Sequence, residues 1–328
     1  MPSSLVWAQP LAVNPALAGI QDAKSQIRFS HLFRRMVTSQ NGLEVSGFEM
    51  AYQSQLGIEM PIRSSLMDGG WGILVGTEHW ASLRTNYLKI IGAYVVPLGA
   101  KVRYAQLRAG IEVGLLQKSL NESTLYLESQ FSGTSFTPTY RYSISSFNQI
   151  RPDLGISLLW SRQQKIKGNP EINYFIGASM HHITRPTFNF TGIYADISLP
   201  IRYRLVGGIK YRTRSPFDFN YALSYERQGL SFLVHNSFFI RYALLKNALL
   251  FSESKAFFNW GFHLRNLETL IAFTGVEYAH KYLLGLSYEL PIGNPQLENI
   301  YFGGIHFLLG LLLKPGVWKE NQHPIPQF

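Results

Sequence analysis

Large apolar residues alternate with small or polar ones along the stretch from Phe217 to Arg241. In its first half, one side of the alternation is aromatic or aliphatic and the other is not: Phe217, Phe219, Tyr221, Leu223 and Tyr225 against Asp218, Asn220, Ala222, Ser224 and Glu226. After the sequence Arg-Gln-Gly, the alternation resumes at Phe232, Val234, Phe238 and Ile240. A period of two on both sides of a short turn predicts a β-hairpin. Its apolar face suits either the interior of a water-soluble sandwich or the lipid-facing side of a membrane barrel with a polar lumen.

The same alternation recurs along most of the chain. It is found near residues 27–34, 48–53, 71–76, 88–94, 106–115, 154–160, 174–180, 201–212, 258–265, 270–278, 284–290 and 304–311. Together with the hairpin, these stretches predict about fourteen strands of roughly 10–12 residues, the strand length of membrane barrels. Strands of soluble domains average only about 5–6 residues, and arginines within strands fit a wet lumen better than a sandwich core. We therefore predict an all-β fold, a transmembrane antiparallel β-barrel of about 14 strands in a single domain.

The predicted barrel occupies residues 23–313, between an N-terminal periplasmic lead of residues 1–22 and a C-terminal tail of residues 314–328. The lead lacks the basic region and long apolar core of a secretory signal. Because an outer-membrane protein needs such a signal for export, we expect that it has been removed from this chain or that the start of the chain is set at the wrong position. The longest irregular stretch, Asn121–Arg151, is rich in Ser, Thr and Asn and predicts a long surface loop that folds over or into the barrel.

Composition supports the membrane interpretation. Charged residues make up only 15% of the chain and aromatic residues 14%, whereas soluble domains carry about 25% charged residues. The sequence contains no run of about 18 apolar residues, which excludes helical membrane spans. Cysteine is absent, so disulfides and thiolate metal sites are excluded. The net charge of +10 is scattered along the strands without a basic block, so we predict outer-membrane lipid, and no nucleic acid, as a partner.

The polar positions of the alternating stretches predict the residues that line the lumen. These are Arg108, Glu112, Arg202, Arg204, Lys210, Asp218 and Glu226. Arg108 and Glu112 stand four residues apart on one face of a strand, which suggests a lumenal ion pair. The cations also allow an alternative function, a porin that favours anionic solutes. However, the inward face carries much apolar bulk, which indicates a narrow or plugged lumen: Leu233, Phe257, Phe273 and Leu308.

Candidate catalytic and metal-binding chemistry is sparse. His181 and His182 are adjacent, and neighbouring residues of a strand point to opposite faces, so they are not expected to chelate one metal ion. The sequence lacks a Gly-x-Ser-x-Gly motif, a phosphate-binding loop and a His-Glu-x-x-His motif. A Ser-His-acid set could be assembled from different strands, but no spacing favours one. We therefore predict no enzymatic activity, no cofactor and no metal.

Three short motifs stand out, although each is weak alone. The first, from Asn14 to Gly19, reads Asn-Pro-Ala-Leu-Ala-Gly and by itself predicts a rigid turn before the first strand. The second is Pro-Asp-Leu-Gly at residues 152–155, and the third runs from Gly177 to Pro186. With the Leu-Pro-Ile-Arg-Tyr stretch at 199–203 and Tyr-Glu-Arg-Gln-Gly at 225–229, they resemble in order and spacing the PorP/SprF family of outer-membrane proteins of the type IX secretion system. The motif residues are Asn14, Pro15, Gly19, Pro152, Asp153, Gly155, Gly177, Ser179, His182 and Pro186.

The resemblance implies a docking protein and not an enzyme. It implies an accessory or anchoring subunit of the type IX secretion and gliding-motility machinery in the bacterial outer membrane. The implied partners are type IX secretion components, such as a periplasmic ring component, or a large surface adhesin with a type-B C-terminal domain, or both. It also implies that the lone barrel is not the protein-conducting pore. The lead and the Asn121–Arg151 stretch are our candidates for protein contact.

Overall fold

The computed structural model describes residues 9–20, 27–40, 51–63, 68–80, 83–97, 105–120, 147–165, 171–189, 196–213, 215–244, 256–279, 281–292 and 300–313. Two short helices come first, α1 (Pro10–Val13) and the 3-10 helix η1 (Pro15–Leu17). The strands are β1 (Ile27–Gln40), β2 (Tyr52–Arg63), β3 (Asp68–Trp80), β4 (Leu83–Val96), β5 (Ala105–Leu120), β6 (Phe147–Lys165), β7 (Glu171–His181), β8 (Thr187–Asn189), β9 (Asp196–Ser198), β10 (Arg202–Arg212), β11 (Phe217–Gln228), β12 (Ser231–Ala243), β13 (Ala256–Arg265), β14 (Thr269–Tyr278), β15 (Tyr282–Pro291) and β16 (Ile300–Leu313).

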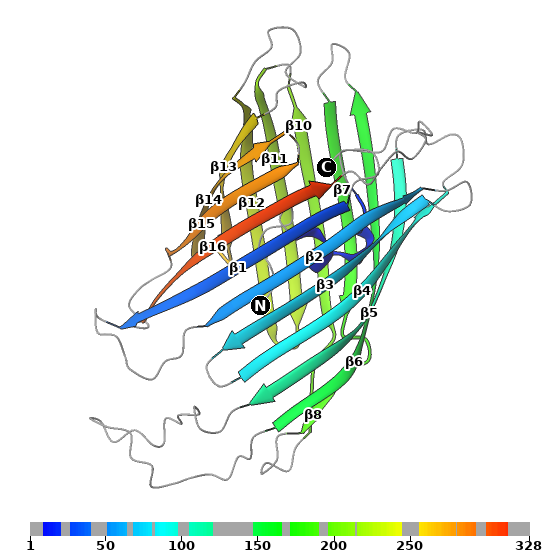
Figure 1. Cartoon of the computed structure of the whole chain (residues 1–328), viewed down its shortest axis with the longest axis vertical. Coiled ribbons are helices and arrows are strands. Elements are labelled where there is room, and N and C mark those ends of the chain that lie inside the picture. Colours follow the sequence, from blue (N-terminus) through cyan, green and yellow to red (C-terminus); the bar gives the residue numbers. More distant parts are fainter. Residues whose placement is uncertain are drawn as a thin grey trace.

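Fourteen of these strands form one closed antiparallel barrel. Barrel strands that are consecutive in the sequence are hydrogen-bonded neighbours in the ring, and β7 pairs with β10. The first and last strands close the ring, with Ile27 opposite Leu313 and Gln40 opposite Ile300, so blue β1 and red β16 lie side by side in Figure 1. Closure removes the exposed sheet edges, as a membrane-spanning sheet requires. The predicted antiparallel barrel of about fourteen strands is confirmed.

The alternation in the sequence corresponds to the two faces of the barrel wall. On β11 the outward residues Tyr221 and Leu223 are each 44% exposed, whereas inward Ala222 and Glu226 are 1% and 5% exposed. The hairpin predicted there is formed by β11 and β12, with Gly229 in the turn at φ +60°. Large apolar side chains therefore face outward around the wall, which is the arrangement that contacts lipid.

One strand differs from its prediction. The alternation placed a strand near residues 48–53, whereas β2 runs from Tyr52 to Arg63; residues 48–50 lie outside the described residues. Polar Ser54 interrupts the outward apolar series of β2 between Tyr52 and Leu56, and Pro61 stands within the strand. These residues weaken the apolar alternation, which is why the strand was misplaced. Of the predicted Asn121–Arg151 loop, residues 147–151 belong to β6, and residues 121–146 lie outside the described residues.

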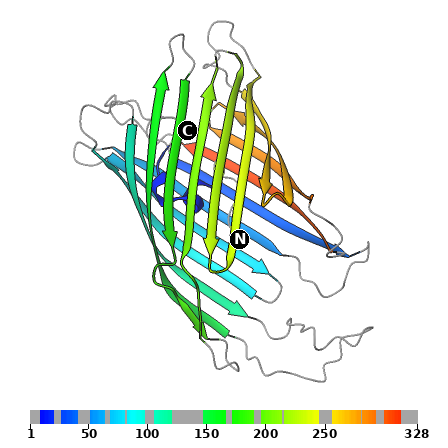
Figure 2. The same ribbon diagram turned by 180° about the vertical axis from the view of Figure 1, so that it is seen from behind.

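Residues 9–20, which we call the plug segment, lie inside the barrel. Figures 1 and 2 show the blue helical segment within the ring of strands from both sides. Ala16 and Ala18 of the plug segment are 0% exposed and Leu11 is 2% exposed. The plug segment packs on two apolar patches of the inner wall, one formed by Leu159, Val206 and Ala222 and the other by Leu74, Ile91 and Ala93.

The position of the plug segment corrects our expectation of a lead outside the barrel, in the periplasm. A barrel of this strand number is wider than its own inward side chains can fill, and the apolar residues of the plug segment gain burial by occupying that space. Residues 1–8 and 21–22 of the predicted lead lie outside the described residues. Within the part of the chain that the structure describes, no helix has the length and apolar character needed to cross a membrane.

Candidate functional site

The Asn14–Gly19 motif shapes the plug segment. Pro10 and Pro15 each stand in the first turn of a short helix, where the missing amide hydrogen costs no hydrogen bond. Between the helices Asn14 is extended, at φ −153°, and its Oδ1 accepts a hydrogen bond of 2.9 Å from the Ala16 amide. Gly19 ends the motif at φ +71°, a left-handed conformation that favours glycine. The motif predicted as a rigid turn is therefore the fold of the plug segment itself.

Arg108 of β5 and Glu59 of β2 bind the second half of the plug segment. The Arg108 side chain is 1% exposed, and its Nε donates to the Ala16 carbonyl oxygen over 2.9 Å. Its Nη2 donates to the carbonyl oxygen of Ala18. The amide of Gly19 donates to Glu59 Oε2 over 2.9 Å. The guanidinium thus satisfies two backbone carbonyls that would otherwise be buried without partners.

Arg204 of β10 binds the first half. Its Nη1 donates to the carbonyl oxygens of Ala12 and Val13, over 2.6 and 3.1 Å. Its Nε donates to Glu226 Oε2 on β11 over 2.7 Å, so a carboxylate balances the charge of this buried guanidinium. The predicted lumenal residues Arg204 and Glu226 therefore form one unit that holds the first half of the plug segment, as Arg108 and Glu59 hold the second.

Two glycines let the plug segment touch the wall. A Cβ atom on Gly110 would lie 2.4 Å from the Ala16 amide nitrogen, and one on Gly177 would lie 2.8 Å from Asn14 Nδ2. Asn14 Nδ2 instead donates long hydrogen bonds to the carbonyl oxygens of Leu158 and Ala178, at 3.4 and 3.5 Å. Any larger residue at these positions would displace the plug segment.

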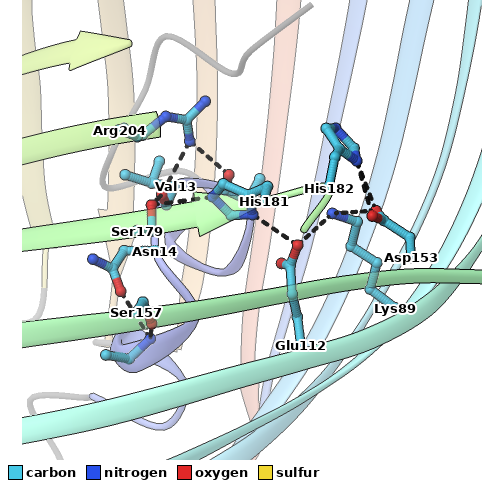
Figure 3. Close-up of polar contacts among 12 residues, drawn as sticks. Val13, Asn14, Lys89, Glu112, Asp153, Ser157, Ser179, His181, His182 and Arg204 are labelled. Atoms are coloured by element: carbon cyan, nitrogen blue, oxygen red, sulfur yellow. Dashed lines mark hydrogen bonds and ion pairs between the residues drawn. The ribbon is translucent and has the colours of Figure 1, made fainter. Parts of the chain in front are cut away.

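A polar chain continues from the plug segment along the inner wall of β4 to β7 (Figure 3). Ser179 Oγ lies 3.1 Å from His181 Nε2, and His181 Nδ1 lies 2.7 Å from Glu112 Oε1. Lys89 then joins Glu112, at 2.8 Å, to Asp153, at 3.5 Å. The chain ends at His182, whose Nδ1 is 2.9 Å from Asp153 Oδ2. The motifs of β6 and β7 therefore meet in the lumen beside the plug segment.

Two sequence predictions about side-chain direction were wrong here. His181 and His182 do not point to opposite faces, because β7 ends at His181 and His182 adopts φ +59°, which turns its ring back into the lumen. Arg108 and Glu112 do not form the expected ion pair with each other, since Arg108 binds the plug segment and Glu112 binds Lys89 and His181. At about 3.3 Å per strand residue, positions four apart are too distant for direct contact.

Five other predicted site residues lie on the barrel wall or near its strand ends. Lys210 is 8% exposed on the inner wall of β10. Asp218 lies 3.6 Å from Arg241. A Cβ on Gly155 would lie 2.6 Å from the Glu112 side chain, so this motif glycine makes room for the polar chain. Pro186 is buried and Pro152 is exposed.

Several residues that bind the plug segment, or that belong to the polar chain beside it, were missed. Glu59, Ser157, Lys89 and His181 were not predicted. Each stands on the inward, polar side of its strand, and that is the signal that could have found it. Ser157 shows this: it lies between outward Ile156 and Leu158, and its Oγ accepts a hydrogen bond of 2.9 Å from the Ala16 amide.

Ser179, His181 and Glu112 have the order of a Ser-His-acid relay. Ser179, however, is 4% exposed, and its Oγ lies 3.5 Å from the Val13 carbonyl oxygen of the plug segment. It does not line the cavity described below. The hydroxyl therefore has no room for a substrate beside it, and the relay orients groups that hold the plug segment. Within the described residues, no group of three or more His, Asp or Glu is placed to hold a metal ion.

A cavity of about 330 Å³ lies on one side of the plug segment. Ala12 of the plug segment forms part of its boundary, and the cavity extends to the ends of strands, where Leu83 begins β4, Arg202 begins β10 and Gln228 ends β11. Its other lining residues are Gln55, Leu74, Glu78, Thr85, Tyr87, Lys89, Glu112, Leu116, Lys118, His182, Leu199 and Arg204.

Comparisons with known proteins identify a family by sequence and similar barrels by structure. The sequence profile of the family described as "Type IX secretion system membrane protein PorP/SprF" matches residues 7–310. No curated protein sequence shows significant similarity to this chain.

Among solved structures, the Ralstonia pickettii toluene transporter TbuX is similar with a TM-score of 0.55 at 10% identity, over 94% of this chain and 93% of that chain. The CymD monoaromatic hydrocarbon channel has a TM-score of 0.53 at 13% identity, over 94% and 93%. The Pseudomonas putida toluene transporter TodX has a TM-score of 0.52 at 10% identity, over 94% of each chain. At such low identity these structures share the barrel fold with this chain and nothing more specific.

Proposed function

The chain belongs to the PorP/SprF family of type IX secretion system membrane proteins, and on that premise we propose that it is a non-conducting docking subunit of that system. The family and the closed barrel make it an outer-membrane protein. The proposal adds that the barrel anchors a partner at the membrane: a periplasmic ring component, or a surface adhesin with a type-B C-terminal domain. In this role the aromatic and aliphatic outer face holds the barrel in lipid, and the partner binds at its ends.

The observation that carries the proposal is the plug segment. It lies inside the barrel and is bound by side chains of β2, β5, β6, β7 and β10. Arg108 and Arg204, which a cationic porin would present to anionic solutes, donate their hydrogen bonds to plug carbonyls. A barrel whose lumen is occupied in this way suits an anchor better than a pore, and it speaks against the porin alternative and against enzymatic turnover in the lumen.

Capture from native membranes tests the docking role. The full chain, tagged at an exposed turn such as Gly229–Leu230, is purified from the membranes of a type IX-secreting bacterium, and the retained proteins are identified by mass spectrometry. We expect a ring component, an adhesin with a type-B C-terminal domain, or both. An unrelated outer-membrane barrel with the same tag is the control. Recovery of the barrel alone, or with the proteins that the control also retains, would contradict the proposal.

Planar-bilayer recording separates anchor from porin. We expect the purified full chain to insert and to give little or no steady current, because the plug segment occupies the lumen. Steady anion-selective current would favour the porin function instead.

A further inference from the structure

The 330 Å³ cavity beside the plug segment has a charged side and an apolar side. Its lining carries four cations, Lys89, Lys118, Arg202 and Arg204, and two carboxylates, Glu78 and Glu112. Two carboxylates outside the lining, Glu226 and Asp153, pair with Arg204 and Lys89. Leu74, Leu83, Leu116 and Leu199 form much of the remaining wall. The volume corresponds to about ten water-sized groups.

Most of the charged groups in the lining already have partners. Arg204 binds Glu226 and the plug segment, and Lys89 binds Glu112. Lys118 lies over the Phe188 ring, with Nζ 5.1 Å from the ring centroid. Glu78 accepts a hydrogen bond of 3.0 Å from Gln53.

Arg202 is the exception among the described lining residues. It is partly buried, its Nε is a buried donor without a hydrogen-bond partner, and no carboxylate of the described residues lies in salt-bridge contact with it. The Tyr87 hydroxyl, next to Gln53 and Gln55, is a second polar group of the cavity. A buried donor left without an acceptor is costly, and a carboxylate is the group that matches a guanidinium best.

We propose that this cavity binds a small organic carboxylate, with its charged end on Arg202 and an apolar body of about ten non-hydrogen atoms against the leucines. Tyr87 supplies a second donor or an acceptor next to the same lining. Both a free alkanoate and the C-terminal residue of a peptide have this chemistry. The inference goes beyond the docking role, and the two can fail separately. A barrel that binds carboxylates but captures no partner contradicts only the docking role. A barrel that captures a partner but binds no carboxylate contradicts only the carboxylate site.

Calorimetry with matched ligands tests it. The full chain is reconstituted in lipid nanodiscs and titrated with octanoate or acetyl-leucine. Octanamide and acetyl-leucinamide, which have the same apolar groups without the negative charge, are the matched controls. Empty nanodiscs give the blank. We expect at least one carboxylate to bind, and its amide to bind about tenfold more weakly or less. Tighter binding of octanoate assigns the site to free alkanoates, and tighter binding of acetyl-leucine assigns it to peptide ends.

Variants tie the binding to the cavity. We expect Arg202→Gln to weaken carboxylate binding about tenfold or more, and Thr85→Trp, which fills the cavity from β4, to weaken it as well. Arg227→Gln is the matched control, because Arg227 lies at the same end of the barrel and is exposed outside the cavity. The heat-dependent gel mobility of folded barrels checks that each variant folds. Absent binding of both carboxylates, equal binding of an amide, or unchanged binding in both cavity variants would overturn the proposal.

Discussion

Single glycines in the barrel wall set how closely the plug segment can approach it. A Cβ on Gly110 would lie 2.4 Å from the Ala16 amide nitrogen, whereas a Cβ on Gly92 of the neighbouring strand would meet nothing nearer than Ile111 Cγ2 at 3.8 Å. The same substitution should therefore have opposite outcomes at these two positions. Because the chain has no cysteine, one introduced thiol can report release of the plug segment.

We expect Gly110→Ala to expose the plug segment. In a Val13→Cys background, where the side chain is 2% exposed in the parent, maleimide labelling reports its release. Overpacking by one methyl costs about 1–3 kcal/mol, so labelling should accelerate about 5- to 150-fold. Gly92→Ala should leave the rate unchanged. Equal rates in the two variants would show that the close contact at Gly110 does not restrain the plug segment.

Arg108 restrains the plug segment through charge as well as shape. We expect Arg108→Met, which keeps the length of the side chain but removes its donors, to accelerate labelling of Val13→Cys about tenfold or more. The reason is that one hydrogen bond to a charged group contributes about 1.5–3 kcal/mol, and Arg108 donates to both Ala16 and Ala18. Arg227→Met, at an exposed position, is the control. An unchanged labelling rate for Arg108→Met would assign the restraint to the apolar contacts alone.

At the scale of elements, the strands and the plug segment are held by different interactions. Each barrel strand is paired along its length with two neighbours through the backbone, whereas the plug segment is bound by side chains and by apolar packing. The barrel ladder therefore does not depend on the plug segment. The plug segment, in contrast, gains its partners only from a wall that has already closed.

Deletion of residues 9–20 should leave a folded barrel with an open lumen. We expect the deletion variant to keep the heat-dependent gel mobility of a barrel and to conduct steadily in planar bilayers, unlike the full chain. Arg108, Glu112 and Arg204 would become accessible to water in the lumen. Loss of the folded band would mean that the plug segment is needed for folding of the barrel, and absence of current would mean that other residues close the lumen.

At the scale of the whole molecule, the two ends of the barrel carry different connections. Long connections join β5 to β6, through residues 121–146, and β7 to β10, through residues 182–201; both lie at the end where β11 turns into β12. The opposite end has the start of β1, the end of β16 and shorter connections, of which residues 244–255 are the longest. Outer-membrane barrels place longer loops outside the cell and short turns in the periplasm.

We therefore expect the β11–β12 turn to face the outside. An impermeant maleimide added to intact cells should label Leu230→Cys, whose parent side chain is 99% exposed, and should not label Ser215→Cys, in an exposed turn at the other end. Both should be labelled after the cells are lysed, which is the control for reactivity. Labelling of Ser215→Cys alone in intact cells would reverse the orientation.

Much of the fold followed from the sequence because the side-chain period of a strand is a local property. The outward Tyr221 and inward Glu226 of β11 could be assigned from their neighbours alone. β2 was misplaced because polar Ser54 interrupts its outward apolar series and because a proline such as Pro61 is unusual within a strand. His182 was assigned to the wrong face because one residue at φ +59° ends the alternation, and nothing in the sequence marks that conformation.

The sequence by itself determined that the chain forms an antiparallel membrane barrel with a charged inner face, because alternation and strand length depend only on residues that are consecutive in the chain. Only the tertiary structure decided what fills that barrel. The Asn14–Gly19 motif lies inside because Arg108, 92 residues from Ala16, and Arg204, 191 residues from Val13, come within hydrogen-bond distance when the wall closes. Such contacts join distant parts of the chain, and no local pattern encodes the distance between them.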